Sequence, residues 1–433
     1  MKKYILLTLI FPLIAACTYK EPEVFDEKPA GRTTETLDAY KKDLEYDGYW
    51  LLSYYPQVNR SIASYPRADR GLGGYNIFLK LKSGKVWASS EVETSNDEVA
   101  SFFTYQVTEG PTLSFDTYNK VLHHFRRTSG QFPNARGGDI EFVIQKKEGD
   151  IFTVMGRSSN VEMSLEKFSG NRETYLNKVR ENVALLRGKG LTPITLGGTS
   201  VSLMLFPSYR QIVFSYGSEI KQQAFRVTDR GIVFFEPITI NGVTLTQLNF
   251  NDDNTALKTP DGAISTTLVA CPIEITRTAK TIDFGGSGVS TAFTNTFNNT
   301  NAWTQWEYSW YDMSWDKVLK VQILSGNDDQ DATGFYKYVT SSDNTYGAAT
   351  YYEADFVAVG EHSDQVRILL KDPADNEAYR SGARKNYIQF FSYLVNILYK
   401  ELETQSPYQV VDMGTYYKLT SVNNSEYWLH LNK

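Results

Sequence analysis

Apolar and polar residues alternate along much of the chain between residues 49 and 167. From Tyr75 to Leu81, for example, apolar side chains occupy every second position. A period of two is typical of a strand that buries one face. The pattern predicts strands at 50–55, 75–81, 85–90, 103–107, 112–115, 139–145 and 150–155. Short strands separated by turn residues predict an antiparallel barrel or sandwich, and about eight strands in meander order would form a small lipocalin-like barrel.

Helical spacing of apolar residues occurs in three other segments. The first runs from Thr34 to about Glu45 and is followed by Asp47-Gly48. The second runs from Asn171 to Arg187, where Gly188 provides a stop and the predicted apolar stripe is Tyr175, Val179, Val183 and Leu186. The third is a long helix within 376–402, whose apolar side is interrupted by polar residues. That interruption indicates packing on protein and not a membrane crossing.

These elements predict a mainly β protein with minor α content. We expect an N-terminal lipocalin-like barrel or sandwich at 33–170, then a helix plus a second β unit at 171–275. An α+β C-terminal domain follows at 276–433 and ends in a hairpin over 416–431. The boundary near residue 276 depends on a stretch rich in Thr, Asn and Gly that continues to residue 300.

Two segments 120 positions apart resemble each other. In both residues 105–115 and residues 225–235, a predicted strand ends at Val-Thr followed by an acidic residue. A second predicted strand begins three residues later. The match suggests two related β units. Chance similarity between two amphipathic hairpins is the alternative.

The amino terminus carries a secretory signal at 1–16. Lys2 and Lys3 precede a short apolar run that is too short to span a bilayer. The run ends in Ile14-Ala15-Ala16-Cys17, which resembles the lipobox of bacterial lipoproteins. This resemblance implies lipidation of Cys17 and a tether at 17–32. An ordinary signal peptide with an accidental cysteine is the alternative.

Charge and neighbouring sequence refine the expected location. The 44 basic and 50 acidic residues give a net charge of −6, so nothing indicates a nucleic-acid partner. The segment Lys20-Glu21-Pro22-Glu23 resembles the export signals of Bacteroidota surface lipoproteins. We therefore expect an outer-membrane, lipid-anchored protein exposed at the cell surface, with a periplasm-facing anchor as the alternative.

Several motifs over about residues 30–270 resemble the domain-of-unknown-function family 4302. They are Gly48-Tyr49-Trp50, Tyr54-Tyr55-Pro56, Gly73-Gly74-Tyr75-Asn76, the block 110–119 with His123 after it, and Gly138-Asp139-Ile140-Glu141-Phe142. The resemblance brings no activity with it. It implies a Bacteroidota surface lipoprotein that works beside nutrient-import proteins.

Catalytic and metal motifs are missing from the sequence. It contains no HExxH, G-x-S-x-G, phosphate-loop or dinucleotide pattern, so we predict no catalytic residue, metal site or cofactor. His123 and His124 would point to opposite faces of a strand and would not chelate one ion. Glu91 and Glu93 would share a face if extended, and a glycosidase needs two carboxyl groups about 5–9 Å apart. Solvent-facing strand positions explain the two residues equally well.

Other polar clusters have a simple structural interpretation. Asn327, Asp329 and Asp331 alternate like the start of a calcium loop, but Ala332 and Tyr338 replace the required Gly and Glu. Asn249, Asn251 and Asp253 form a similar run in a predicted turn. Cys271 remains as a single thiol once Cys17 is modified, and we expect a small buried hydrophobic residue there.

The most unusual segment is rich in aromatics. Trp303, Trp306, Tyr308 and Trp310 lie within eight positions, and as a strand 305–311 would place the last three on one face. An exposed ladder of this kind would stack on sugar rings, whereas a core or interdomain seam is the alternative. We therefore predict a non-catalytic binding or accessory lipoprotein for glycan or peptide capture. The alternatives are a structural or assembly lipoprotein that binds another envelope protein, and a hydrolase with an unrecognised site.

Overall fold

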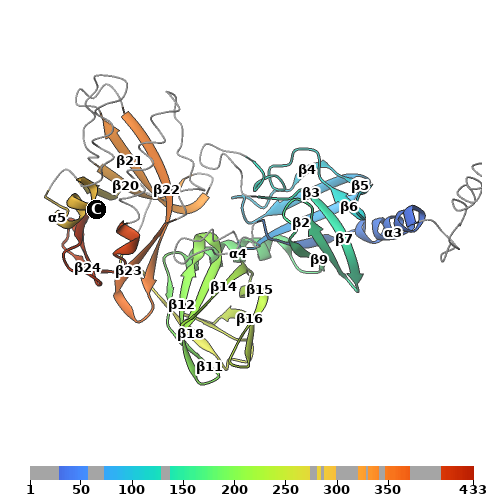
Figure 1. The fold of residues 1–433 in the computed structure, drawn as a ribbon. Helices are drawn as coiled ribbons and strands as arrows, with labels where there is room; N and C mark the ends of the chain where they lie inside the picture. The colour runs from blue at the N-terminus through green and yellow to red at the C-terminus, as the bar shows by residue number, and fades with distance from the viewer. Residues whose placement is uncertain are drawn as a thin grey trace, which may run out of the picture.

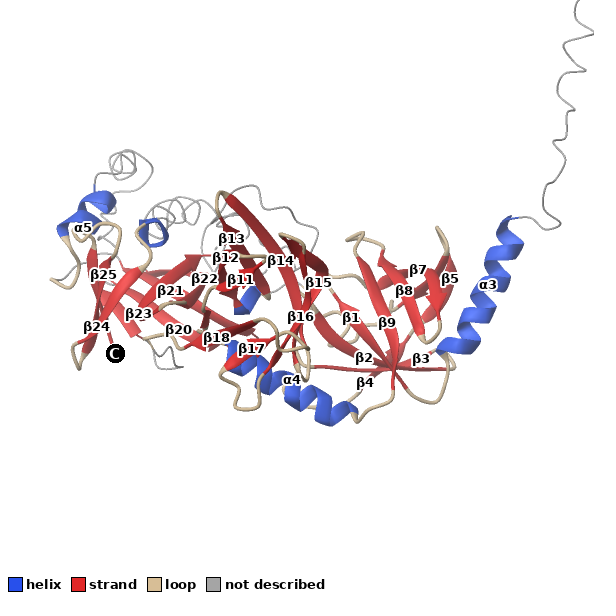
Figure 2. Ribbon diagram, turned by 90° about the horizontal axis from the view of Figure 1, so that it is seen from below, coloured by secondary structure: helices blue, strands red, loops and turns tan. Residues whose placement is uncertain are grey.

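The chain folds into three β units that follow one another in sequence order. The computed structural model describes residues 29–56, 73–127, 137–273, 280–283, 287–298, 320–327, 330–340, 347–370 and 401–433. In both ribbon views the second unit lies between the first and the third, with the N-terminal helix α3 (Pro29–Leu44) at the far end of the first unit (Figures 1 and 2). The mainly β fold class is confirmed.

The first unit is a nine-stranded antiparallel half barrel. Its strands are β1 (Tyr49–Tyr54), β2 (Tyr75–Lys82), β3 (Lys85–Ser90), β4 (Val99–Phe102), β5 (Thr104–Val107), β6 (Pro111–Ser114), β7 (Glu141–Glu148), β8 (Ile151–Gly156) and β9 (Glu162–Phe168). The first strand pairs with the last, and the edge strands β4 and β5 are separated only by Phe103. The amide of Phe103 donates to the Gly84 carbonyl oxygen at 3.0 Å and so continues the pairing of β4 with β3 up to the bend.

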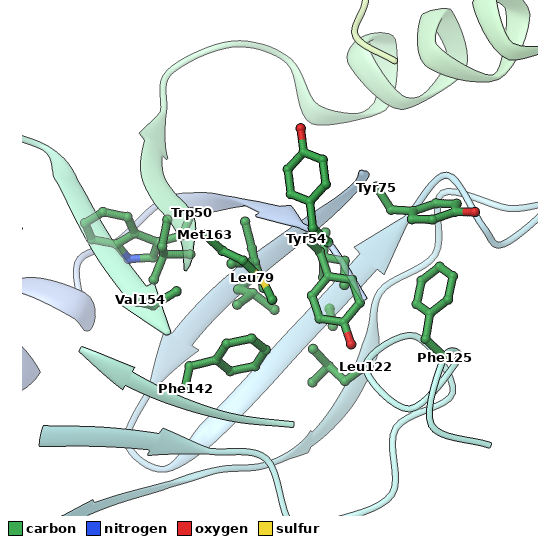
Figure 3. Close-up of a cluster of buried hydrophobic side chains, with 14 of the residues drawn as sticks. Trp50, Tyr54, Tyr75, Leu79, Leu122, Phe125, Phe142, Val154 and Met163 are labelled. Carbon is green, nitrogen blue, oxygen red and sulfur yellow. The ribbon is translucent and has the colours of Figure 1, made fainter. Parts of the chain in front are cut away.

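Aromatic side chains fill the interior of the first unit. Trp50, Tyr54 and Phe142 project into the space between its strands, together with Val154 and Met163 (Figure 3). Trp50 Nε1 donates to the Leu44 carbonyl oxygen at 2.8 Å and so fastens α3 to β1. The predicted alternation of strands is thus explained by a packed core on their inner face.

The second unit begins with α4 (Arg172–Leu186) and continues as a second half barrel of nine strands. These are β10 (Gly190–Leu191), β11 (Ile194–Leu196), β12 (Thr199–Phe206), β13 (Gln211–Tyr216), β14 (Glu219–Val227), β15 (Gly231–Ile240), β16 (Val243–Phe250), β17 (Ala256–Lys258) and β18 (Ser265–Val269), with a 3-10 turn η2 (Pro207–Tyr209) before β13. Asn171 caps α4, accepting a hydrogen bond from the Thr174 amide at 2.9 Å.

The buried face of α4 differs from the predicted stripe. Val179 and Leu186 are buried as expected, but Tyr175 and Val183 are only partly buried, and Leu176 and Asn182 take their place. The reason is that α4 contacts both units. Leu176 packs with Leu51 and Phe78 of the first unit, and Asn182 Nδ2 donates to the Thr228 carbonyl oxygen of the second at 2.8 Å.

The two half barrels share one order of elements. Each consists of a helix followed by strands at eight positions in meander order. In this count, β4 and β5 of the first unit are one bent strand, and so are β10 and β11 of the second. The two hairpins that resemble each other in sequence, β5–β6 and β14–β15, then occupy the fourth and fifth positions in their units. Their turns differ by one residue in length, with Thr108 N donating to Gly110 O and Thr228 N to Gly231 O. The shared order of elements supports interpreting the two units as a repeat.

The third unit is a closed barrel of eight strands. They are β19 (Lys280–Asp283), β20 (Lys320–Asn327), β21 (Gln330–Thr340), β22 (Gly347–Val359), β23 (His362–Leu370), β24 (Tyr408–Asp412), β25 (Tyr416–Ser421) and β26 (Trp428–Asn432), with α5 (Thr291–Asn298) between β19 and β20. The predicted terminal hairpin corresponds to β25 and β26. Most of the helix predicted at 376–402 lies outside the described residues, and residues 401–404 are helical.

Candidate functional site

The residues predicted for anchoring and ligand stacking lie outside the described part of the chain. This applies to Cys17 and to the aromatic segment Trp303, Trp306, Tyr308 and Trp310. Their roles therefore stay predictions. The described residues contain a different aromatic surface and a buried polar junction, which are considered in turn.

The strand expected at His123 and His124 is wrong, because residues 121–126 form successive turns. His123 Nδ1 lies 3.1 Å from the carbonyl oxygen of Asn119, and the His124 ring packs on Phe125. Burial lowers the pKa of His123. Within the described residues, no three His, Cys, Asp or Glu side chains are placed to hold a metal ion.

The condition under which Glu91 and Glu93 would share a face is not met. Residues 91–95 are turns and bends and not an extended segment, so the two side chains meet different partners. Glu93 pairs with Lys120 at 2.6 Å near the surface. The Glu91 carboxylate is buried, where it accepts hydrogen bonds from the Asn76 amide at 2.9 Å and from Arg210 Nη1 at 2.9 Å.

The Glu91 carboxylate is part of a junction between the first two units. Gly74 N donates to the Phe225 carbonyl oxygen at 2.9 Å, and Asn76 Nδ2 donates to that of Val227 at 2.8 Å. Arg226, also buried, donates to Asn76 Oδ1. A methyl group on Gly74 would lie 2.5 Å from the Tyr55 ring, so the close approach requires glycine. These contacts assign a structural role to the motif Gly73-Gly74-Tyr75-Asn76.

The asparagine and aspartate clusters act as turns. Asp253 Oδ1 accepts from the amide of Thr255 at 3.1 Å and from its hydroxyl at 2.6 Å, which lowers the pKa of Asp253. Asn251 Oδ1 accepts from the Ala256 amide at 2.9 Å. Asn327 and Asp331 lie in β20 and β21, on either side of a hairpin turn, and Asp329 lies outside the described residues.

The outer face of β24, β25 and β26 is the strongest candidate for a binding site. Because directly paired residues in an antiparallel sheet share a face, the strand register places the outward side chains in rows. One row holds Gln409, Thr420 and Trp428, the next Val411, Lys418 and His430, and the last Tyr416 and Asn432. The alternate residues, including Tyr408, Val410, Leu419, Leu429 and Leu431, are buried inside the barrel.

Three aromatic rings run diagonally across this face. The Tyr416 and His430 rings stack with centroids 4.1 Å apart and planes at 26°. The His430 and Trp428 rings follow at 5.1 Å and 38°. All three side chains are partly exposed. We call this surface, comprising the eight residues in the rows above, the aromatic face.

The electrostatics of the aromatic face favour a neutral imidazole beside a lysine. Burial lowers the pKa of His430, and the charge of Lys418 lowers it further. Lys418 Nζ lies 5.5 Å from the centroid of the Trp428 ring. Flat apolar rings, a hydroxyl, an amide and an ammonium group thus lie on one surface, as in sites that orient a ligand with a few polar groups.

Sequence reasoning predicted the hairpin but missed its outward face. The signal was present as alternation, with Tyr416, Lys418 and Thr420 on one strand and Trp428, His430 and Asn432 on the next. Which of these residues become neighbours depends on the register of the hairpin. The register therefore had to be known before the aromatic residues were recognised as a group.

The fold and this face define a mainly β protein of three consecutive β units, the last of which carries a partly exposed aromatic surface. Within the described residues, none of the helices combines the length and apolar character needed to cross a bilayer. The family model described as "Domain of unknown function (DUF4302)" matches residues 21–252, which is more than half of the chain. The chain belongs to this family.

Two further comparisons add little. No curated protein matches the chain. The structure of a DNA polymerase III beta chain from Streptococcus pneumoniae covers 92% of this chain and 97% of its own, at 7% identity and a TM-score of 0.11. Such a score does not indicate a shared fold.

Proposed function

We propose that this protein is a lipid-anchored outer-membrane protein that captures a glycan ligand without catalysis, using the aromatic face. One observation carries the proposal. The Tyr416 and Trp428 rings each contact the His430 ring, and all three are left partly exposed on the outside of a barrel whose core is filled by apolar side chains. Burying a ring is strongly favourable, so an accessible set of rings indicates that a partner covers it.

The position of the aromatic face supports a surface role. The β24 and β25 strands lie at the end of the molecule opposite α3 (Figure 2). Twelve residue steps separate Cys17 from Pro29, which is about 40 Å at full extension. A lipid on Cys17 would hold the first unit near the membrane and present the third unit away from it.

The anchor itself follows from the lipobox. The protein is acidic overall, so an anionic membrane surface would not attract it, and lipid must hold it there. Several acyl chains on one cysteine give stable attachment, whereas one chain gives only marginal binding. We propose nutrient-import proteins of the same membrane as neighbours.

Ligand capture is tested with a glycan array, followed by calorimetry on the full chain purified from membranes in mild detergent. We expect Trp428→Ala to weaken binding of a glycan found on the array at least ten-fold, or about 1.4 kcal/mol. Trp87→Ala is the matched control, because Trp87 is also a partly exposed tryptophan on a strand but belongs to the first unit. Equal affinity of wild type and Trp428→Ala for that glycan would refute the role of the face.

The anchor is tested separately by metabolic labelling with a tagged fatty acid. The wild-type chain should incorporate the label and sediment with membranes, and Cys17→Ser should do neither. Cys271→Ser is the control, because it removes the other cysteine of the chain and should leave labelling unchanged. An unlabelled wild-type chain would contradict the anchor.

A second candidate function is docking to another envelope protein. It is favoured by Val411 and Met413, which lie at the edge of the aromatic face and are 48% and 51% exposed. Exposed apolar side chains beside aromatics are common at protein interfaces. This alternative would be established if the wild-type chain recovers one envelope protein in stoichiometric amount and binds no glycan. The recovery should be lost in Val411→Asp and unaffected by Trp87→Ala.

A further inference from the structure

The charged group on the aromatic face is the feature that bears on ligand class. Lys418 lies in the middle row, with Val411 as its neighbour on β24 and His430 as its neighbour on β26. Neither neighbour carries a negative charge. The ammonium group of Lys418 is therefore flanked by an aliphatic side chain and by an imidazole.

Seven lysines in the described part of the chain have a carboxylate partner, and Lys418 is not one of them. Lys80, Lys120, Lys146, Lys147, Lys167, Lys178 and Lys433 each lie within salt-bridge distance of an aspartate or glutamate. Within the described residues, the contact of Lys418 is with the Trp428 ring. In a chain with an excess of acidic residues, this ammonium group stays available to an external anion.

Two carboxylates near the face have hydrogen-bonding partners other than Lys418. Asp412, next to Val411 in the chain, pairs with Lys433 at 2.6 Å. Asp364 accepts a hydrogen bond from Gln409 Nε2 at 2.7 Å. The cation–π contact of Lys418 with the Trp428 ring is weak at an exposed site and does not neutralise the ammonium charge.

We infer that the aromatic face selects an acidic saccharide, in which a sugar ring stacks on Trp428 and Tyr416 while a uronate carboxylate binds Lys418. This inference rests on the proposed function and adds the ligand class to it. Thr420 and Asn432 supply hydroxyl and amide groups in the rows above and below Lys418, where they would hydrogen-bond to sugar hydroxyls. The His430 ring contributes a further flat surface, because it stacks on Tyr416 with centroids 4.1 Å apart.

The test compares two probes that differ only at their carboxyl groups, which are charged in one probe and methyl-esterified in the other. Trigalacturonate and its fully methyl-esterified form are titrated into the full chain by calorimetry at low and high salt. We expect the acid to bind about five-fold more tightly than the ester at low salt, and the difference to shrink at high salt because the interaction is an exposed ion pair. Lys418→Gln should remove the difference without weakening the ester, and Lys418→Arg should preserve it.

Lys85→Gln is the matched control, because Lys85 Nζ lies over the Phe102 ring at 5.9 Å on the first unit. It removes the same charge from the same kind of contact and should preserve the preference for the acid. Equal binding of acid and ester by wild type, or a preference retained in Lys418→Gln, would overturn the inference and leave glycan capture standing. If the chain binds neither probe and also binds no glycan on the array, both the acidic-saccharide inference and the proposed glycan capture are overturned.

Discussion

Replacing Glu91 by Gln tests whether the buried ion pair holds the first two units together. The side chains of Glu91 and Arg210 are only 2% and 6% exposed, and their charged atoms lie 2.9 Å apart. The substitution keeps the shape of Glu91 but leaves Arg210 buried without its counter-charge. It also turns one acceptor of the Asn76 amide into a donor.

The expected loss is large for one substitution. Removing one partner of a buried pair costs about 3–5 kcal/mol in free energy of unfolding. With a urea m value of about 2 kcal/mol/M, this lowers the midpoint by about 1.5–2.5 M. Glu93→Gln is the control two positions away, because its pair with Lys120 is partly exposed and should contribute about 0–1 kcal/mol.

The assay must distinguish the units, because a chain with several units need not unfold in a single step. Hydrogen exchange in urea, read by mass spectrometry on peptides from β2 and β14, reports the first and second units separately. Both peptides should lose protection at the same lowered urea concentration, while peptides from β25 should not change.

Arg210→Met in combination with Glu91→Gln provides a further check. Because the double variant no longer carries an unpaired buried charge, it should be less destabilised than the sum of the single variants. If Glu91→Gln lowers the urea midpoint no more than Glu93→Gln does, the ion pair does not hold the two units together.

Three other predictions follow from named contacts. Gly74→Ala should destabilise the first two units by about 2 kcal/mol or more in urea unfolding, because its methyl group would lie 2.5 Å from the Tyr55 ring; Gly110→Ala, whose nearest contact is 3.2 Å, should cost clearly less, and equal losses would contradict the packing argument. Tyr54→Phe should cost about 1–3 kcal/mol in the same assay, since it leaves the Asp139 amide without the hydroxyl that accepts from it at 2.7 Å; a wild-type midpoint would show that this bond is dispensable. Burial raises the pKa of the Cys271 thiol to about 11, so iodoacetamide labelling of the folded chain should stay slow at pH 8 and rise steeply only above pH 10, and fast labelling at pH 8 would contradict the burial.

Some features of the candidate face were within reach of the sequence and others were not. The hairpin over 416–431 was predicted because alternation and the Asn423-Asn424 turn are local signals. The stacking of Tyr416 on His430 was not, because these residues are diagonal neighbours and depend on the register of two strands. The predicted ladder at 303–310 lies outside the described residues and stays a prediction.

The buried junction between the first two units could not be predicted from the sequence, because it also depends on contacts between distant residues. Glu91 was interpreted as a solvent-facing or catalytic carboxylate, because nothing close to it in the chain identifies a partner. Its partner Arg210 is 119 positions away and belongs to another unit. The stripe predicted for α4 failed in part because the helix packs on two units, whereas a periodicity argument assumes one buried face.

The sequence by itself therefore determined most of the strands, the position of α4 and the resemblance of two hairpins, whereas α3 begins at Pro29, before the predicted Thr34, and α5 was not predicted. These properties depend on spacing and turn chemistry within a few residues. Only the tertiary structure decided that Glu91 is buried against Arg210 and that Tyr416, His430 and Trp428 form one surface. Such contacts depend on how strands pair and how units pack, and the chain brings those residues together only once it has folded.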